Sequence, residues 1–314
     1  MHWKAKGLLQ KMLGVLPGGQ PLHYRLQRHF GGLRDFEREL ATKLDDWRIM
    51  LERLHESDID IVDRHLLEIG TGWYPTFPLA CHLAGARRVS SFDLNPHLRA
   101  DLTRACARRL GEELDMIAQV ARVDARDVRE RHARLLAGLE RGAPLEAASA
   151  GAITCRAPAD ASATGFAPGD IDLIFSNSVL EHVPPAIIDA LNREAMRVLR
   201  PGGAMFHSVN CGDHYAYVDP RINQLNYLRY SDREWVFWDN AFLYQNRMRA
   251  HEFVDRARDA GFEIVLDTAR PTERRLAELA AMRVHAQFAQ VPPEKLCITS
   301  VDFIGRKPGE VAAP

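Results

Sequence analysis

Hydrophobic positions along the chain change their spacing near residue 60. Before that point they recur at three- and four-residue steps between charged residues, as at Leu40, Leu44 and Leu51, which is the spacing of one buried helix face. After it they form short apolar runs that end at glycine or acidic residues. We therefore predict an N-terminal helical lid or appendage over residues 1–60 and a larger domain over residues 61–314.

Short apolar runs in the larger domain predict the strands of one sheet. The first two runs, at residues 65–69 and 88–92, are each followed by a helix-forming segment, and two such steps indicate a parallel sheet with right-handed crossovers. Further runs lie at residues 152–155, 171–176, 204–209, 262–267 and 298–304. With an antiparallel final pair, they predict an α/β fold: a doubly wound, Rossmann-like, mainly parallel seven-stranded sheet with an antiparallel last strand.

Two segments interrupt this alternation. Residues 98–139 are rich in Arg, Ala, Leu and Glu without a strand-like run, which predicts two helices, more than one crossover needs. Residues 210–250 are aromatic and irregular, and we predict that they form an insertion that caps the substrate over one end of the sheet. Aromatic residues interleaved with polar ones are typical of a small-molecule pocket wall, although packing of the insertion onto the sheet is the alternative for each of them.

Composition excludes several classes of protein. A hydrophobic content of 46% excludes disorder of the whole chain, and a formal net charge of −1 provides no global field for nucleic acid or an anionic membrane. The five cysteines are widely spaced without a C-x-x-C pair, which argues against a disulfide framework and favours the reducing cytoplasm. No stretch approaches the roughly 20 apolar residues that span a bilayer.

The turn after the first predicted strand, Glu68-Ile-Gly-Thr-Gly72, carries two glycines. Such glycines let the backbone bend tightly and approach a ligand, while the next helix points its N-terminus at that ligand. Asp93 ends the next strand about 20 residues later, where an acidic side chain accepts hydrogen bonds from ribose hydroxyls. It also fits a helix N-cap, because Asn95-Pro96 follows. Together these features predict a site for a nucleotide-like cofactor.

Two cofactors fit this turn, NAD and S-adenosylmethionine. A dinucleotide site needs a third glycine where the pyrophosphate crosses the helix N-terminus, and Tyr74 and Pro75 stand there instead. Glu68, an acidic residue inside the strand, suits an ammonium and a sulfonium better than a pyrophosphate. The residues therefore favour S-adenosylmethionine.

Five motifs follow one another between about residues 60 and 210. They are Glu68-Ile-Gly-Thr-Gly72, Ser91-Phe-Asp93-Leu, Ala157-Pro-Ala-Asp160-Ala, Asp170-Ile-Asp172-Leu-Ile-Phe-Ser176-Asn-Ser-Val-Leu-Glu181-His182-Val and Leu199-Arg-Pro-Gly-Gly203. In this order they resemble class I S-adenosylmethionine-dependent methyltransferases, particularly the group that includes the ubiquinone and menaquinone biosynthesis enzymes. The resemblance implies S-adenosyl-L-methionine as the cofactor, makes residues 61–314 the methyltransferase domain, and makes residues 98–151 a helical insertion.

The resemblance also implies which residues bind the cofactor. They are Glu68, Gly70, Thr71, Gly72, Asp93, Leu94, Asp160, Ala161 and Asn177. The glycines would pack against the methionine part, Glu68 would lie near its amino group, and Asp93 would hold the ribose. Asp160 would accept a hydrogen bond from the adenine amino group, for which Asp124 is the competitor. Ser176 is the alternative to Asn177.

Methyl transfer needs little beyond an in-line approach, and a base is required only if the acceptor loses a proton. Because ligands of open α/β sheets bind beyond the carboxyl ends of the strands, we expect the candidate catalytic residues His182, Asp213 and His214 to lie there, with a structural role as the alternative for each. The candidate substrate-binding residues are Tyr24, His207, Tyr215, Tyr244, Asn246 and Arg247. We expect no metal, because no cluster of His, Cys or Asp has metal-ligand spacing.

The principal functional hypothesis is an enzyme that transfers a methyl group to O, N, S or C of a small-molecule acceptor. The first alternative is a catalytically inactive S-adenosylmethionine-binding scaffold or partner protein. The second is an RNA or protein methyltransferase, which is disfavoured because no basic stripe accompanies the aromatic segment. We expect no nucleic acid partner and no membrane span, and exposed N-terminal helices would allow a homodimer.

Overall fold

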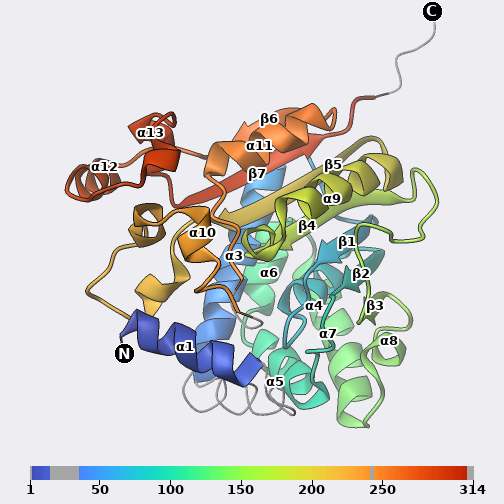
Figure 1. The fold of residues 1–314 in the computed structure, drawn as a ribbon. Helices are drawn as coiled ribbons and strands as arrows, with labels where there is room; N and C mark the ends of the chain where they lie inside the picture. Colours follow the sequence, from blue (N-terminus) through green and yellow to red (C-terminus); the bar gives the residue numbers. More distant parts are fainter. Residues whose placement is uncertain (1, 15–34, 241–243, 310–314) are drawn as a thin grey trace, which may run out of the picture.

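The computed structural model describes residues 2–14, 35–240 and 244–309 (Figure 1). The strands of this part form one seven-stranded sheet in the order β3-β2-β1-β4-β5-β7-β6. Their bounds are β1 (His65–Ile69), β2 (Arg88–Phe92), β3 (Ile153–Arg156), β4 (Ile171–Asn177), β5 (Leu199–Asn210), β6 (Glu263–Asp267) and β7 (Ser300–Arg306). The first five strands pair in parallel, and β7 is antiparallel to both β5 and β6. The predicted fold class is confirmed.

Strand β1 lies at the point where the order of the strands in the sheet reverses. It pairs with β2 on one side and with β4 on the other, so the chain returns to the centre after building the β2–β3 edge. In open α/β sheets, ligands bind in the crevice beyond the carboxyl ends of the strands at such a switch point. The topology therefore brings the ends of β1, β2 and β4 to one place.

Helices cover both faces of the sheet (Figure 1). On one face lie α3 (Phe36–Glu56), α4 (Thr76–Leu83) and the helices of the β2–β3 connection, and on the other lie α9 (Pro185–Val198) and α11 (Ala250–Asp259). Neighbouring strand residues alternate between the two cores: Leu66 belongs to the α3 side and Leu67 to the α9 side. Because both faces are covered, the central strands read as continuous apolar runs.

The connection between β2 and β3 contains more helices than the sequence predicts. They are α5 (Ala100–Leu110), α6 (Leu114–Ala121), α7 (Ala125–Glu140) and the short α8 (Leu145–Ala148). The break between α6 and α7 falls at Arg122, whose φ of 57° is left-handed, and Asp124 then caps α7 by accepting a hydrogen bond from the Arg126 N–H. The helix expected at Asn95 also begins later, at Ala100.

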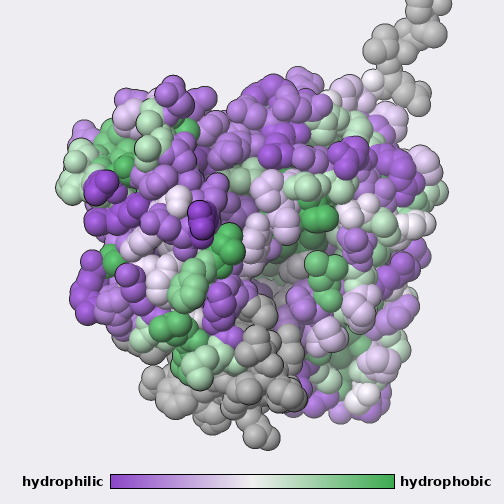
Figure 2. Space-filling view, in the orientation of Figure 1, coloured by the Kyte–Doolittle hydropathy of each residue, from purple (hydrophilic) through white to green (hydrophobic). Residues whose placement is uncertain are grey.

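Residues 210–240 form short turns of helix around an aromatic centre. These elements are η3 (His214–Tyr217), η4 (Asn226–Arg229) and α10 (Asp232–Trp235). Helix α1 (Trp3–Gly14) docks on them through Trp3, whose ring lies 4.8 Å from that of Trp238 and 5.3 Å from that of Tyr215. The outer side of α1 exposes Leu8, Leu9 and Met12. Figure 2 shows hydrophobic surface in the region of this helix.

The remaining elements lie between β6 and β7. They are α12 (Glu273–Ala280), η5 (Ala286–Phe288) and α13 (Pro293–Leu296). Helix α12 ends at Ala280, and α13 begins at a proline. Within the described residues, no helix has both the length and the apolar character needed to cross a membrane.

Candidate active site

A cavity of about 530 Å³ opens at the carboxyl ends of β1, β2 and β4. Its volume is within the usual range of about 300–1,000 Å³ for small-molecule sites. The predicted cofactor-binding residues on its wall are Gly70, Gly72, Asp93, Leu94, Asp160, Ala161 and Asn177. The fold therefore brings together side chains and turns that are far apart in the sequence.

The β1 turn requires glycine at Gly70. Its φ is +87°, and a Cβ placed there would lie 2.5 Å from Cγ2 of Val179. Gly72, with a φ of +70°, directs its backbone N–H to Oδ2 of Asp93 at 2.9 Å. Oδ1 of Asp93 accepts the Asn95 N–H at 2.8 Å, so this carboxylate fixes the backbone of two turns at once. The glycines thus leave the backbone, and not a side chain, as the wall of the cavity.

Glu68 and Thr71 lie behind this turn. Both side chains are buried, Ser91 donates a hydrogen bond to Oε2 of Glu68, and the Thr71 and Ser91 hydroxyls pair with each other. Burial raises the pKa of Glu68 to about 8, opposed by the Ser91 hydrogen bond and by the charge of Lys43. A cation entering the cavity would favour the ionised form of this carboxyl.

Helix α3 supplies polar residues to the cavity that sequence reasoning missed. Lys43 lies with its Nζ 4.4 Å from the Tyr74 ring centroid, and burial lowers the pKa of its ammonium. Asp46 accepts a hydrogen bond from Nδ2 of Asn177 at 2.9 Å, and burial raises its pKa. Lys43 and Asp46 are three residues apart, and both lie beside the buried face of α3. This helical spacing is the sequence signal by which they could have been predicted.

The sequence leaves two pairs of alternatives open, and in the structure the two members of each pair lie in different places. Asp160 lies on the cavity wall, where its Oδ1 accepts the Ser162 N–H at 2.8 Å, whereas Asp124 caps α7 in the helical connection. Ser176 is fully buried, and its hydroxyl lies 2.7 Å from Nδ1 of His207. Strand alternation therefore turns Asn177, and not Ser176, toward the cavity.

The predicted catalytic residues separate into two groups. His182 lines the cavity, and the ring of His214 lies 5.0 Å from it. Asp213 is fully buried away from the cavity wall and accepts hydrogen bonds from the Tyr215 N–H and from Nδ2 of Asn226, each at 2.8 Å. Because Asp213 is fully buried off the cavity wall and both of its oxygens are bonded within the protein, its geometry is that of a structural cap and not of a base.

Five of the six residues expected to bind substrate belong to the described part of the chain, and they lie away from the cavity wall. Tyr24 lies outside the described residues. None of the other five lines the cavity: His207, Tyr215, Tyr244, Asn246 and Arg247. The geometry therefore argues against the predicted direct contacts, for reasons that differ between them.

His207 is buried within β5, where desolvation lowers the pKa of its imidazole to about 3. The Tyr215 hydroxyl donates to the Trp238 carbonyl at 2.9 Å. Arg247 donates to the Tyr227 and Tyr230 carbonyls and pairs with Asp232. These groups are satisfied internally, and such residues stabilise the segment without reaching a ligand.

Tyr244 and Asn246 act on the cavity through the loop after β4. Nδ2 of Asn246 donates to the Leu180 and Val183 carbonyls at 2.7 and 2.8 Å, and the Tyr244 carbonyl lies 2.7 Å from Nδ1 of His182. These hydrogen bonds hold the loop that carries His182 and therefore position its side chain.

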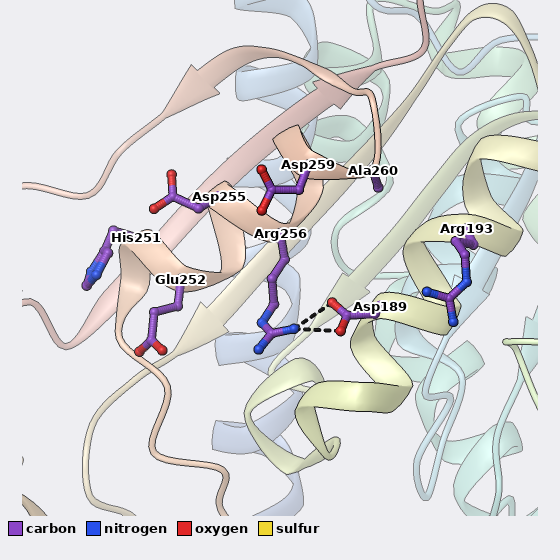
Figure 3. A pocket seen from close by; sticks show the side chains of 8 residues that line it. All are labelled: Asp189, Arg193, His251, Glu252, Asp255, Arg256, Asp259 and Ala260. Atoms are coloured by element: carbon purple, nitrogen blue, oxygen red, sulfur yellow. Dashed lines mark hydrogen bonds and ion pairs between the residues drawn. The ribbon is translucent and has the colours of Figure 1, made fainter. Parts of the chain in front are cut away.

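A second depression lies between α9 and α11 (Figure 3). Charged residues line it, and Arg256 contacts both carboxylate oxygens of Asp189 at 2.6 Å. It shares no lining residue with the cavity at the strand ends and carries none of the predicted site residues. The cavity at the switch point is therefore the candidate active site.

Residues 67–207 match a family model described as "Methyltransferase domain". No curated protein matches the sequence. Among solved structures, an S-adenosylmethionine-dependent methyltransferase from Mesorhizobium loti has 15% identity and a TM-score of 0.43 over 81% of this chain and 96% of its own. Geranyl diphosphate C-methyltransferase from Streptomyces coelicolor has 16% identity and a TM-score of 0.46 over 87% and 83%.

The structural likenesses are too distant to carry a functional argument. The family match runs from β1 into β5 and includes the glycine turn, Asp93, Asp160 and His182. This family match shows the methyltransferase class but does not identify the ubiquinone and menaquinone group within it. The observed sheet order and the cavity at the β1–β4 switch point complete the assignment. The chain carries a class I methyltransferase domain, the domain of an enzyme that uses S-adenosylmethionine as its cofactor.

Proposed function

We propose that this enzyme transfers the methyl group to a small-molecule acceptor that binds at the His182 end of the cavity. One observation carries the proposal: a single cavity is lined by the glycine turn and Asp93 and also by an imidazole within an apolar wall. The apolar part of this wall comes from Val179, Ile187 and Leu191. Small-molecule sites have the same arrangement, in which apolar side chains exclude water around a polar group, here the imidazole of His182.

The cofactor is proposed to lie across the strand ends. Asp93 holds the ribose hydroxyls, Asp160 accepts from the adenine amino group, and Leu94 and Ala161 contact the ring. The backbone at Gly70 and Gly72 faces the methionine part. Lys43 is placed to pair with the cofactor's carboxylate, because its ammonium lies 3.8 Å from the position of a Cβ on Gly72.

His182 is proposed as the base for acceptors that lose a proton. Its Nδ1 lies 2.7 Å from the Tyr244 carbonyl, which can only accept, so Nδ1 carries the proton and Nε2 keeps its lone pair. The side chain is exposed at the cavity rim. The atom methylated is O, N, S or C, and the first three need a base only when they are protonated in the bound acceptor.

An RNA acceptor is disfavoured by the charges around the cavity. Its lining carries Glu39, Asp46, Asp93 and Asp160 against Lys43. A polyanion would meet net repulsion at this entrance.

A measurement of turnover distinguishes an active enzyme from an inactive binding protein. We would incubate the purified chain with S-adenosylmethionine and a panel of hydroxylated, amino, thiol and carbon acceptors, and measure S-adenosylhomocysteine. Acceptor-dependent release is expected, reduced in His182→Gln when the acceptor must lose a proton. Cofactor binding without release on any acceptor would favour the inactive scaffold.

A further inference from the structure

Three potential metal ligands meet beside the acceptor end of the cavity. Glu181 and His182 belong to η2 (Leu180–His182), which follows β4, and His214 begins η3 after β5. One potential ligand atom of each lies within 4.8 Å of the others. Because β4 and β5 are parallel neighbours, their carboxyl ends place these residues together although the sequence spacing shows no metal motif.

Two of these groups contain buried polar atoms without a partner. The Glu181 side chain is 1% exposed, and its Oε1 accepts the Asn210 N–H at 3.3 Å. Its Oε2 and the Nε2 of His214 are both buried and have no hydrogen-bond partner among the described residues. Leaving such atoms unpaired costs about 1–3 kcal/mol each, and more for a charged group. A cation bound between them would satisfy both.

His182 is oriented as a ligand. Because its Nδ1 proton is directed to the Tyr244 carbonyl, the lone pair of Nε2 is available. A hydrogen bond from the second ring nitrogen to a carbonyl is the usual support for a metal-bound histidine. Lys6 is the charged neighbour that opposes a cation here.

We propose that Glu181, His182 and His214 bind one divalent transition-metal ion, with Zn²⁺ as the representative case. Two imidazoles and one carboxylate form a ligand set used by catalytic zinc, in which a further position stays open. Bonds of about 2.0–2.2 Å place ligand atoms about 3–4 Å apart, so movements of about 1 Å would bring the three atoms onto one ion.

The open position would face the cavity, since His182 lines its wall. An acceptor with a hydroxyl or enol oxygen could then bind the ion directly and lose its proton more readily. With the ion bound, the Nε2 lone pair of His182 is used for the metal, so the ion would replace this imidazole as the group that promotes loss of the proton. This consequence for the acceptor class rests on the proposed function. Binding of the ion does not.

The test is a titration of the metal-stripped full chain with Zn²⁺ by calorimetry and with Co²⁺ by visible absorption, without cofactor. We expect one ion per chain, with affinity about 100-fold or more lower in Glu181→Gln and His214→Gln. The matched control is His251→Gln, because His251 also has a buried, unpartnered Nδ1 but lies in the depression of Figure 3. Circular dichroism would verify that each variant is folded.

Absence of saturable binding, or binding that survives both ligand substitutions, would overturn the proposal. Loss of binding in His251→Gln with retention in His214→Gln would also overturn it, because the ion would then occupy the second depression. Cofactor affinity is measured separately on the same stripped protein. Ion binding without cofactor binding would contradict the proposed function and leave the metal site standing.

Discussion

The two ends of the cavity are built differently. At the cofactor end, Gly70, Gly72 and Asp93 follow two adjacent parallel strands, and one hydrogen bond from Gly72 to Asp93 joins the turns. At the acceptor end, His182 and His214 belong to short helical turns whose positions depend on contacts with the segment after β5. In the proposed function, rigid strand ends would hold the common cofactor, while a separately packed segment would shape the side that must suit one acceptor.

The aromatic segment shows how the acceptor end is held. Its rings do not line the cavity but surround Trp3 of α1, which is 3% exposed. The Trp3 N–H also donates to Asp219 at 2.9 Å, and Lys11 donates to the Phe237 carbonyl at 3.0 Å. Helix α1 therefore stabilises the segment after β5 that supports the acceptor end.

Trp3→Ala is expected to have the largest effect. Loss of a buried tryptophan costs about 3–5 kcal/mol, which should appear as a lower free energy of unfolding and a raised KM for the acceptor. The cofactor affinity should not change, because Trp3 does not line the cavity. Leu9→Ala, on the same helix at a side chain 47% exposed, is the control and should be near neutral. Equal damage to cofactor and acceptor binding would show that the two ends are not separate.

Gly70→Ala comes next. A left-handed φ costs a residue with a Cβ about 1–2 kcal/mol, and the clash with Val179 adds about 1–3 kcal/mol. Calorimetry should show cofactor affinity reduced by tenfold or more, since the turn must shift. Gly142→Ala has a similar φ of +83° with no atom within 4 Å of the added Cβ, so it isolates the backbone cost. Unchanged cofactor affinity in Gly70→Ala would refute the role of this turn.

Asp160→Ala decides which acid contacts adenine. Loss of one exposed hydrogen bond should weaken cofactor binding by about 0.5–1.5 kcal/mol. Asp124→Ala should instead lower the free energy of unfolding by about 1 kcal/mol through loss of the α7 cap, with cofactor affinity unchanged. The opposite pattern in the two variants would transfer the adenine contact to Asp124.

The smallest expected effect concerns the pH dependence of stability. Burial raises the pKa of Glu68 in the folded protein to about 8, above its ordinary value of 4.5, so the folded protein binds this proton more tightly than the unfolded chain. The contribution of Glu68 to stability is therefore fully present below about pH 4.5 and is lost as pH rises toward 8. Denaturant titrations of Glu68→Gln should show a flatter profile in this window. An unchanged profile would indicate that Glu68 is ionised in the folded protein.

The sequence predicted what depends on local patterns. Apolar runs located the strands to within a few residues, because both faces of the sheet are covered. The motif glycines and Asp93, whose spacing follows from the turn geometry, line one cavity. The number of helices between β2 and β3 was missed, since the left-handed break at Arg122 carries no glycine.

The acceptor end was predicted poorly for physical reasons. A segment rich in aromatic and polar residues has the same composition whether it lines a pocket or packs around Trp3, so Tyr215 and Arg247 were assigned to substrate. His207 lies in β5, where its ring faces the core. The cluster of Glu181, His182 and His214 arises from the pairing of two strand ends, which no local pattern records.

The central claim is that the strand ends around Gly70, Asp93 and Asp160 form a site for S-adenosylmethionine. Calorimetric titration of the purified chain with S-adenosylmethionine and S-adenosylhomocysteine tests it most directly. We predict saturable binding of one molecule per chain, competitive between the two ligands and weakened by Gly70→Ala but not by Gly142→Ala. No binding of either ligand to the folded chain would contradict the account.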